Sequence, residues 1–208
     1  MEELSIVVVN LNTKELTLDS LKSIFKEGSR VKKQVIVVDN GSSDGSVEAF
    51  RRLKKEGKIE LIENSGNFGY AKANNQGIRR SKGKYVLLLN NDTIVKKGAL
   101  GVLVDFAKKS PDAGVVGSKL VNLDQTLQAS CYRFPTIGNA IKEYWFGEKG
   151  LFEKYAPKGK KPVEVDAVVG AVFLITPEAR KRIGVLDERY FAYFEDIDYC
   201  RKTWRAGL

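Results

Sequence analysis

The fold class follows from one N-terminal stretch, Leu4-Ser5-Ile6-Val7-Val8-Val9-Asn10-Leu11-Asn12-Thr13. Residues 4–9 are mostly branched apolar residues, a run typical of a strand buried on both faces. Asn12 and Thr13 are residue types that cap helices, and residues 14–26 carry apolar side chains at helical spacing. The turn between strand and helix contains no glycine. This disfavours a nicotinamide- or flavin-binding fold, in which glycines let the backbone approach the pyrophosphate.

The same alternation continues along the chain. Further strands are expected at 35–38, 59–63 and 85–89, and further helices at 46–55, 71–80 and 98–109. This order predicts an α/β fold with a mostly parallel, doubly wound sheet and helices on both faces. After Pro111 the regular alternation of strands and helices ends. Residues 115–121 and 163–176 are expected to form a small mixed or antiparallel extension, with a loop-rich stretch at 131–162 between them.

The amino-acid composition excludes several classes of protein and of active site. The chain has 208 residues, of which 43% are hydrophobic and 29% charged, as in an ordinary soluble domain. It has no histidine, which excludes histidine-based triads and histidine-ligated metals. Cys131 and Cys200 have no partner at metal or redox spacing, so they are interpreted as free thiols in a reducing cytosol. We expect neither a secretory leader nor a membrane span, because the longest apolar run, 167–175, is far shorter than about 20 residues.

The charge balance points to an anionic partner. The net charge is +9, and a nucleoside diphosphate, an acidic lipid surface and a nucleic acid are the alternatives. Residues 132–161 interleave aromatic residues with lysines. They are interpreted either as a solvated loop with buried aromatics or as a peripheral membrane contact. No nucleic-acid recognition fold accompanies the charge, so no nucleic-acid partner is expected.

Polar residues follow three of the predicted strands. They are Asn10, Asp39 and the segment Asn90-Asn91-Asp92. Ligands of such sheets bind beyond the carboxyl ends of the strands, so these residues are expected to converge on one crevice. The oxygen-bearing side chains at 90–92 suit a divalent cation. Asp39 alone has two interpretations, a turn or capping residue, or an acceptor for the imide N–H of a uracil or thymine ring.

The segment Tyr190-Phe191-Ala192-Tyr193-Phe194-Glu195-Asp196-Ile197-Asp198 places carboxylates directly after aromatic residues. A carboxylate against apolar walls has a raised proton affinity, which suits a general base near neutral pH. Glu195, Asp196 and Asp198 are the three carboxylates of this segment that could have this role. Most of the aromatic run is expected to pack in the core, with stacking of one ring on an acceptor sugar as the alternative. Asp198 is expected to pair with Arg201 or Arg205 on a helix surface.

Several motifs together resemble one family. They are the segments 37–46, 63–77, 88–93, 169–172 and 184–200. In this order they are similar to the motifs of family 2 glycosyltransferases, and most of all to the rhamnosyltransferase branch of that family. The resemblance covers nearly the whole chain. It implies a GT-A fold and an inverting transfer from a nucleoside diphosphate sugar.

The resemblance also implies roles for individual residues. The nucleotide-sugar-binding residues would be Asn10, Asp39, Asn67, Lys72, Asn91 and Asp92. Asp92 would also bind Mg²⁺ or Mn²⁺, and Asp196 would deprotonate the acceptor, with Glu195 beside it. Gly170 and Ala171 would lie on the acceptor side. The family's first metal-motif aspartate is Asn90 here, and an amide binds a dication more weakly than a carboxylate does.

These roles lead to one functional hypothesis and two alternatives. The chain is interpreted as a single cytoplasmic domain, with a nucleotide-sugar-binding half at 1–112 and an acceptor-side half at 113–208 that is truncated at its C-terminus. The donor would be a dTDP- or UDP-sugar, with rhamnose favoured, and the acceptor a cell-surface glycan or a lipid-linked glycan at the inner membrane face. A non-catalytic nucleotide-sugar-binding module is the first alternative. A nucleotidyltransferase is the second, disfavoured because the first loop is not rich in glycine and basic residues.

Overall fold

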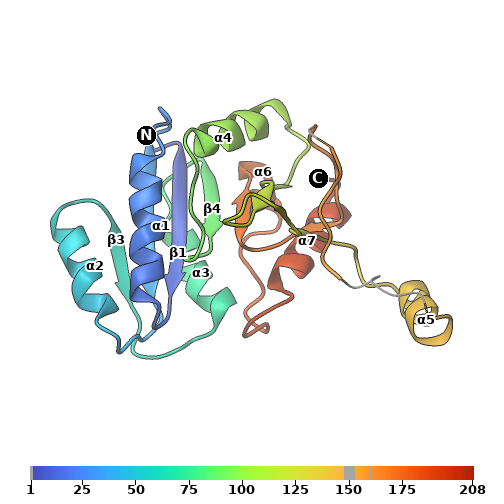
Figure 1. Ribbon diagram of the computed structural model, residues 1–208, viewed down its shortest axis with the longest axis horizontal. Helices are drawn as coiled ribbons and strands as arrows, with labels where there is room; N and C mark the ends of the chain where they lie inside the picture. The colour runs from blue at the N-terminus through green and yellow to red at the C-terminus, as the bar shows by residue number, and fades with distance from the viewer. Residues whose placement is uncertain (1, 148–152, 160) are drawn as a thin grey trace.

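The computed structural model describes residues 2–147, 153–159 and 161–208. Within this part of the chain, one sheet of six strands runs in the order β3-β2-β1-β4-β10-β5 (Figure 1). Its strands are β1 (Leu4–Asn10), β2 (Lys33–Asp39), β3 (Glu60–Glu63), β4 (Tyr85–Leu89), β5 (Val115–Val116) and β10 (Val172–Ile175). The first four are parallel, whereas β10 is antiparallel to both β4 and β5. The predicted α/β fold with a mostly parallel sheet is confirmed.

Helices cover both faces of this sheet (Figure 1). They are α1 (Lys14–Lys26), α2 (Ser46–Lys55), α3 (Tyr70–Arg80), α4 (Ala99–Lys109), α6 (Pro177–Arg182) and α7 (Glu195–Arg205). Side chains alternate between the faces of a strand, so Ile6 of β1 belongs to the core under α1, α2 and α4, whereas Val7 belongs to the core under α3, α6 and α7. Each such burial contributes about 1.5–3 kcal/mol. Two apolar cores therefore hold the strand ends in fixed positions.

Helix α3 lies unusually close to the sheet because of one glycine. A Cβ atom at Gly77 would lie 2.3 Å from Val7 Cγ1. This separation is far below van der Waals contact, so only glycine allows the helix to approach β1 here. The first residues of α3 are thereby held beside the carboxyl ends of the strands.

The C-terminal extension differs from its prediction. The expected strand at 115–121 is divided into β5 and β6 (Leu120–Val121), and β6 pairs with β7 (Leu127–Gln128). The expected strand at 163–176 is divided into β9 (Ala167–Val168) and β10, and β9 pairs with β8 (Cys131–Tyr132). A glycine lies at each break, Gly117 and Gly170. Glycine inside a strand favours such interruptions, and the continuous-strand predictions were wrong for this reason.

The stretch 131–162 also differs, since it contains helix α5 (Ile137–Trp145). Figure 1 shows α5 extending away from the rest of the molecule. Trp145 and Phe146 are 79% and 76% exposed, so the interpretation of this stretch as a loop with buried aromatics is wrong for these two rings. Residues 148–152 and 160 of the predicted membrane patch lie outside the described residues. No helix in the described part of the chain is both long and apolar enough to span a bilayer.

Candidate active site

The ends of β1 and β2 are joined by buried side chains. Asn10 and Asp39 are paired in the register of the sheet, and both are fully buried. The Asn10 amide donates to Asp39 Oδ2 at 2.8 Å and to Ser42 Oγ at 2.9 Å. Thr17 Oγ1 donates to Asn10 Oδ1 at 2.7 Å, so both ends of the Asn10 amide group are satisfied. A buried polar group with complete hydrogen bonding is rigid, because breaking any one bond leaves an unpaired group away from water.

The end of β4 joins the same network. Asn91 Nδ2 donates to Thr13 Oγ1 and, at 3.1 Å, to Thr17 Oγ1. The hydroxyls of these two threonines in turn donate to Asn10 Oδ1. The expected convergence of the three strand ends is therefore confirmed. Thr13 precedes α1, but its hydroxyl makes no cap bond to the helix, so the prediction that residues 12–13 cap α1 is wrong for Thr13.

Asp39 holds the turn that follows β2. Its Oδ1 accepts from the backbone N–H groups of Gly41, at 3.2 Å, and Ser42, at 2.9 Å. Its Oδ2 accepts from Asn10. The turn interpretation of Asp39 therefore describes its contacts in this structure, while its contact with a pyrimidine stays a prediction.

Asp44 performs the capping that Thr13 does not. Its Oδ2 accepts from the backbone N–H of Lys14 at 2.9 Å, and its Oδ1 accepts from that of Ser46 at 3.0 Å. One carboxylate thus satisfies N–H groups at the beginnings of both α1 and α2, where the helix dipoles favour negative charge. The Ser46 hydroxyl, which donates to Asp44, is the main cause that lowers the pKa of this carboxyl group.

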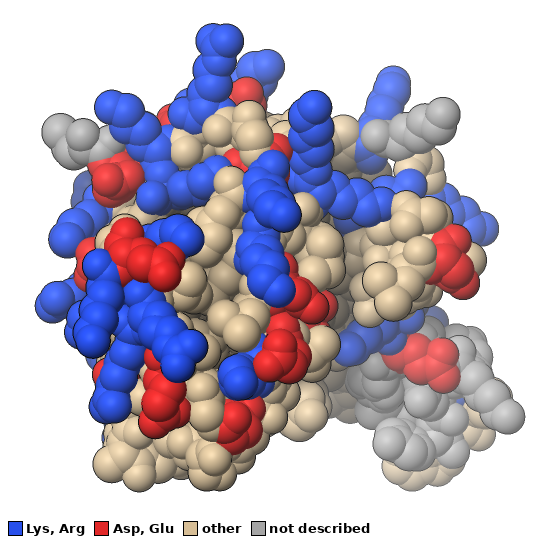
Figure 2. Space-filling model, turned by 60° about the vertical axis from the view of Figure 1, so that its left-hand side comes forward, with Lys and Arg blue, Asp and Glu red and all other residues tan. Residues whose placement is uncertain are grey.

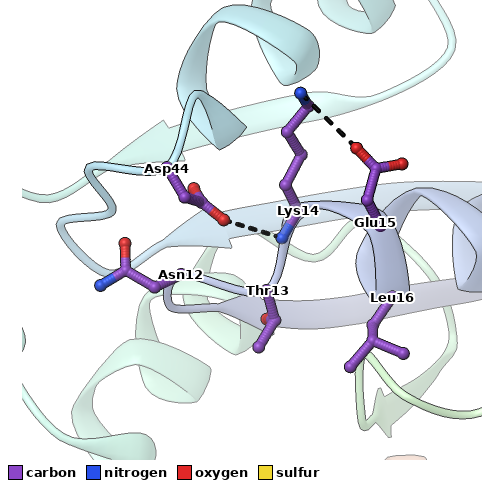
Figure 3. A pocket seen from close by; sticks show the side chains of 6 residues that line it. All are labelled: Asn12, Thr13, Lys14, Glu15, Leu16 and Asp44. Atoms are coloured by element: carbon purple, nitrogen blue, oxygen red, sulfur yellow. Dashed lines mark hydrogen bonds and ion pairs between the residues drawn. The ribbon is translucent and has the colours of Figure 1, made fainter.

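A cavity of about 390 Å³ lies beside this cap. Figure 3 shows its lining, Asn12, Thr13, Lys14, Glu15, Leu16 and Asp44. The lining includes Thr13, so the cavity borders the network that joins the three strand ends. Asp44 already occupies the positive end of α1 (Figure 3). The cavity is therefore a poor site for a phosphate at that helix end.

The loop between β3 and α3 packs on the turn after β2. A Cβ atom at Gly41, where φ is +89°, would lie 2.5 Å from Gly66 Cα, so the two loops touch through backbone. Asn67 Oδ1 accepts from Asn40 Nδ2 and from Gly69 N, both at 2.9 Å. Asn67 thereby fixes the loop that leads into α3. Lys72 on the exposed side of α3 lies 4.8 Å from the centroid of the Phe68 ring.

Tyr70 connects the segment after β4 with the predicted acceptor-side residues. Its hydroxyl lies 2.9 Å from Asn90 Oδ1 and 3.3 Å from the Gly170 carbonyl oxygen, and it can donate to either. The backbone is bridged at the same place, where Asn90 N donates to the Ala171 carbonyl at 3.0 Å. Burial raises the pKa of Tyr70, so its hydroxyl stays protonated as a donor. Sequence reasoning gave Tyr70 no role, although the residue directly follows the glycine-rich loop at the first position of α3.

Asp196 is bound to this bridge through Gly170. Gly170 N donates to Asp196 Oδ2 at 2.9 Å, and Ile197 N donates to Asp196 Oδ1 at 2.8 Å. A Cβ atom at Gly170 would lie 3.4 Å from the Tyr70 hydroxyl and 3.7 Å from Asp196 Oδ2. The predicted base, the predicted acceptor-side residues and the segment after β4 thus form one hydrogen-bonded unit.

Glu195 lies beside Asp196 in a different environment. It is 5% exposed, and its Oε2 has no hydrogen-bond partner among the described residues. Burial, with a smaller contribution from the charge of Asp196, raises the pKa of Glu195 to about 7. The carboxylate with raised proton affinity expected in this segment is therefore Glu195.

The residues around this pair depart from two expectations. Phe191, Tyr193 and Phe194 are 60%, 80% and 60% exposed, so the prediction that they pack in the core was wrong. The backbone explains the exposure: φ is +69° at Tyr193 and +68° at Phe194, which turns the chain outward before α7 begins. Asp198 forms an ion pair with Lys202 at 2.6 Å, one helical turn away, and the predicted arginine pairing was wrong.

Asp92 has the properties expected of a ligand that is free to bind a cation. Its side chain is exposed, and it makes no hydrogen bond or ion pair with the described residues. The described residues contain no cluster of three or more acidic, cysteine or histidine side chains that could hold a metal by itself. Mg²⁺ commonly uses one or two protein carboxylates together with substrate phosphates. Asp92 fits that kind of site, in which the substrate supplies further ligands.

A second cavity, of about 690 Å³, lies at the edge strand β3 and is bordered by basic residues of α2 and α3. Figure 2 shows lysine and arginine side chains interspersed with acidic ones on this face of the molecule. Glu60 pairs with Arg80 at 3.1 Å and with Lys82 at 3.0 Å, and Glu63 pairs with Arg51. Glu60 is the one acidic residue of this lining, and it offsets only part of the positive charge of the four basic residues, Lys54, Arg79, Arg80 and Lys82.

The fold defines a class of proteins, those with a GT-A fold. The structure of a mannosyltransferase from Pyrobaculum calidifontis in complex with GDP-Man and Mn²⁺ superposes with a TM-score of 0.67, at 20% identity over 99% of this chain and 53% of that one. S. aureus TarS 1–349 in complex with UDP-GlcNAc superposes with a TM-score of 0.63, at 16% identity over 97% of this chain and 53% of that one. These likenesses show the GT-A fold.

The chain belongs to glycosyl transferase family 2, because the model of that family matches residues 5–173. A low-salt glycan biosynthesis hexosyltransferase, Agl10 of Haloferax volcanii, is 27% identical over all of this chain and 64% of its own length. An N-acetylglucosaminyl-diphospho-decaprenol L-rhamnosyltransferase of Mycobacterium tuberculosis is 26% identical over 83% of this chain and 61% of its own length. The chain thus spans about three fifths of the length of these relatives. The family expected from the motifs is confirmed.

Proposed function

We propose that this chain is the catalytic part of an inverting, metal-assisted glycosyltransferase. It moves a sugar, with rhamnose favoured, from a dTDP- or UDP-sugar to a cell-surface glycan or a lipid-linked acceptor. The observation that carries the proposal is a path of contacts from Asp196 to Asn90, two residues before Asp92. Gly170 N donates to Asp196, and the Tyr70 hydroxyl lies within hydrogen-bond distance of both Gly170 O and Asn90 Oδ1. This path ties a base candidate to a metal-ligand candidate, and both are needed on opposite sides of a transferred sugar.

The acceptor hydroxyl is activated by a carboxylate in this proposal. A sugar hydroxyl is a weak nucleophile until a base within hydrogen-bond distance removes its proton as the new bond forms. Asp196 has this role, because its two oxygens are oriented by the N–H groups of Gly170 and Ile197. Such fixed hydrogen bonds hold the base in one orientation, which lowers the cost of reaching the reactive geometry.

The donor lies beyond the strand ends in this proposal. Asp92 would hold Mg²⁺ or Mn²⁺ against the diphosphate, and a bound cation supplies charge stabilisation to the leaving group. Asn10, Asp39 and Asn91 keep the strand ends together, and Asn67 with Lys72 borders the same side. Attack from the side of Asp196 and departure on the side of Asp92 would invert the anomeric centre. The rhamnosyltransferase among the relatives supports rhamnose as the favoured sugar.

Titration of dTDP, UDP and GDP into the protein, with and without Mn²⁺, tests the donor assignment. We expect one pyrimidine diphosphate to bind, and Mn²⁺ to strengthen binding at least about tenfold, because Asp92 would hold the cation and the cation would offset the charge of the phosphates. Asp92→Ala should remove the effect of Mn²⁺. Asp124→Ala, an exposed carboxylate of the β6–β7 hairpin, should leave it unchanged.

Two results would contradict this assignment. Equal Mn²⁺ dependence in Asp92→Ala would move the metal site elsewhere, and failure of all three nucleotides to bind would remove the donor site. Donor binding without any turnover in the full-length protein would instead indicate a non-catalytic nucleotide-sugar-binding module.

Residues 132–161 are proposed to contact the inner face of the cell membrane. Ile137, Trp145 and Phe146 expose large apolar surfaces in and directly after α5, and Lys142 and Lys158 are exposed on the same segment. Apolar and basic side chains together suit an anionic bilayer surface. Such contact would bring the site to a lipid-linked acceptor.

Sedimentation with phosphatidylglycerol-containing vesicles measures this contact. We expect the Trp145→Ala, Phe146→Ala double variant to bind at least about tenfold more weakly, because two large rings no longer leave water. Leu123→Ala is the control, since Leu123 is 96% exposed in the β6–β7 hairpin. Equal sedimentation of the double variant would contradict the proposal.

A further inference from the structure

The loop directly before α7 exposes three large aromatic rings. Phe191, Tyr193 and Phe194 are 60%, 80% and 60% exposed, although burial of such rings is among the most favourable contributions to folding. Contiguous exposed apolar side chains commonly mark a binding surface. The rings immediately precede Glu195 and Asp196, the two predicted catalytic residues.

The backbone under these rings is strained. φ is +69° at Tyr193 and +68° at Phe194, a left-handed conformation that bulky residues rarely adopt. Strain of this kind persists only where the surrounding structure enforces it, and it clusters at ligand-binding sites. Two consecutive left-handed aromatic residues are therefore a second observation, independent of the exposure of the rings.

The surrounding structure does enforce this conformation. Phe191 O accepts from Tyr70 N at 2.6 Å, Tyr190 N donates to Asp187 O at 3.2 Å, and Asp198 N donates to Phe194 O at 2.9 Å. Gly69 also fits tightly against the loop, since a Cβ atom there would lie 2.6 Å from Phe191 O. The loop is tied to α3 on one side and to the first turn of α7 on the other.

We propose that Tyr193 and Phe194 form a stacking platform for a pyranose ring of the acceptor. The inference rests on the proposed function, and it adds the residues that select and orient the acceptor. The Cα atom of Phe194 is two peptide units from that of Asp196, so the two lie within about 7.6 Å of each other. A sugar on these rings would have its hydroxyls beside the base.

The chemistry of a pyranose ring fits this surface. One face of such a ring presents C–H groups, which pack favourably on an aromatic face, while the edges present hydroxyls for hydrogen bonding. Because the backbone under the rings is already fixed by hydrogen bonds, binding does not have to order the loop, which reduces its entropic cost. The strained backbone thus keeps the rings out of the core, so that they remain accessible to a pyranose ring.

An array of immobilised glucosides, galactosides, rhamnosides and N-acetylglucosaminides, probed with protein saturated in dTDP or UDP and Mn²⁺, tests the platform. We expect the unsubstituted protein to bind at least one pyranoside, and Tyr193→Ala or Phe194→Ala to lower its affinity about tenfold, the loss of one good aromatic stacking contact. Leu123→Ala removes an exposed apolar side chain elsewhere and should have no effect.

Glycine variants distinguish the contribution of the aromatic rings to binding from the effect of backbone strain on stability. Tyr193→Gly and Phe194→Gly should lose pyranoside binding like the alanine variants, yet melt at a higher temperature than those variants, because glycine tolerates positive φ. Unchanged pyranoside binding in the alanine variants, or no pyranoside binding by the unsubstituted protein while nucleotide binding persists, would overturn the platform. If the unsubstituted protein binds neither dTDP nor UDP, the proposed function is overturned instead.

Discussion

Asp196→Asn is expected to lower the transfer rate about 10²- to 10⁴-fold, the range typical of losing a positioned general base. An amide cannot accept the proton of the acceptor hydroxyl. Donor affinity should change less than about twofold, because Asp196 is proposed to act on the acceptor, and it contacts Gly170 rather than the segment after β4. Product formation at saturating donor, together with the dissociation constant of the nucleotide, measures both effects.

The controls follow from the contacts of Asp196. Both of its oxygens accept backbone N–H groups, and an asparagine has only one oxygen, so Asp196→Asn leaves one of these N–H groups facing an NH₂ group. Thermal unfolding of the variant is therefore measured alongside activity. Asp198→Asn removes a carboxylate that pairs with Lys202, and it should retain activity within a few-fold. Substantial turnover by folded Asp196→Asn would exclude Asp196 as the base.

Glu195→Gln is expected to stabilise the protein at pH 8 by at most about 3 kcal/mol and to have little effect at pH 4.5. Burial raises the folded-state pKa of Glu195 from 4.5 to about 7, so the folded protein favours the protonated form. Its contribution to stability is therefore fully present below pH 4.5 and is lost as the pH rises to about 7. Glutamine has no proton to lose, and this pH dependence disappears.

Denaturant unfolding of both proteins at pH 4.5 and pH 8 measures the difference. Comparing the variant with the unsubstituted protein cancels the titration of all other groups. Glu178→Gln alters a surface pair with Arg182 and should shift the curves little at either pH. A difference between Glu195→Gln and the unsubstituted protein that is the same at both pH values would contradict the raised pKa.

Residues 4–109 could be predicted well from the sequence, because their signals are local. Apolar strands, amphipathic helices and polar turns follow one another there, and the predicted Tyr85–Leu89 strand and the helices at 14–26 and 46–55 have the observed bounds. The convergence of Asn10, Asp39 and Asn91 follows from the parallel sheet alone.

Features that depend on distant contacts could not be predicted. Asp44 caps a helix that begins thirty residues earlier, and β8 pairs with β9 across α5. The bridging role of Tyr70 depends on Asn90 and Gly170, which only the folded sheet brings together. The exposure of Tyr193 and Phe194 before α7 could not be predicted, because hydrophobic residues are expected to be buried. The left-handed backbone at these two residues turns their side chains outward.

The position of β10 has a consequence for the way the protein is made. Strands β1 to β4 follow one another in the chain and lie side by side in the sheet, but the next position in the sheet belongs to a strand that begins at Val172. Until the ribosome has added some eighty further residues beyond β4, Leu87 and Leu88 form an open apolar edge. Such edges readily pair with other chains. During this interval the nascent chain should depend on chaperones that cover this edge.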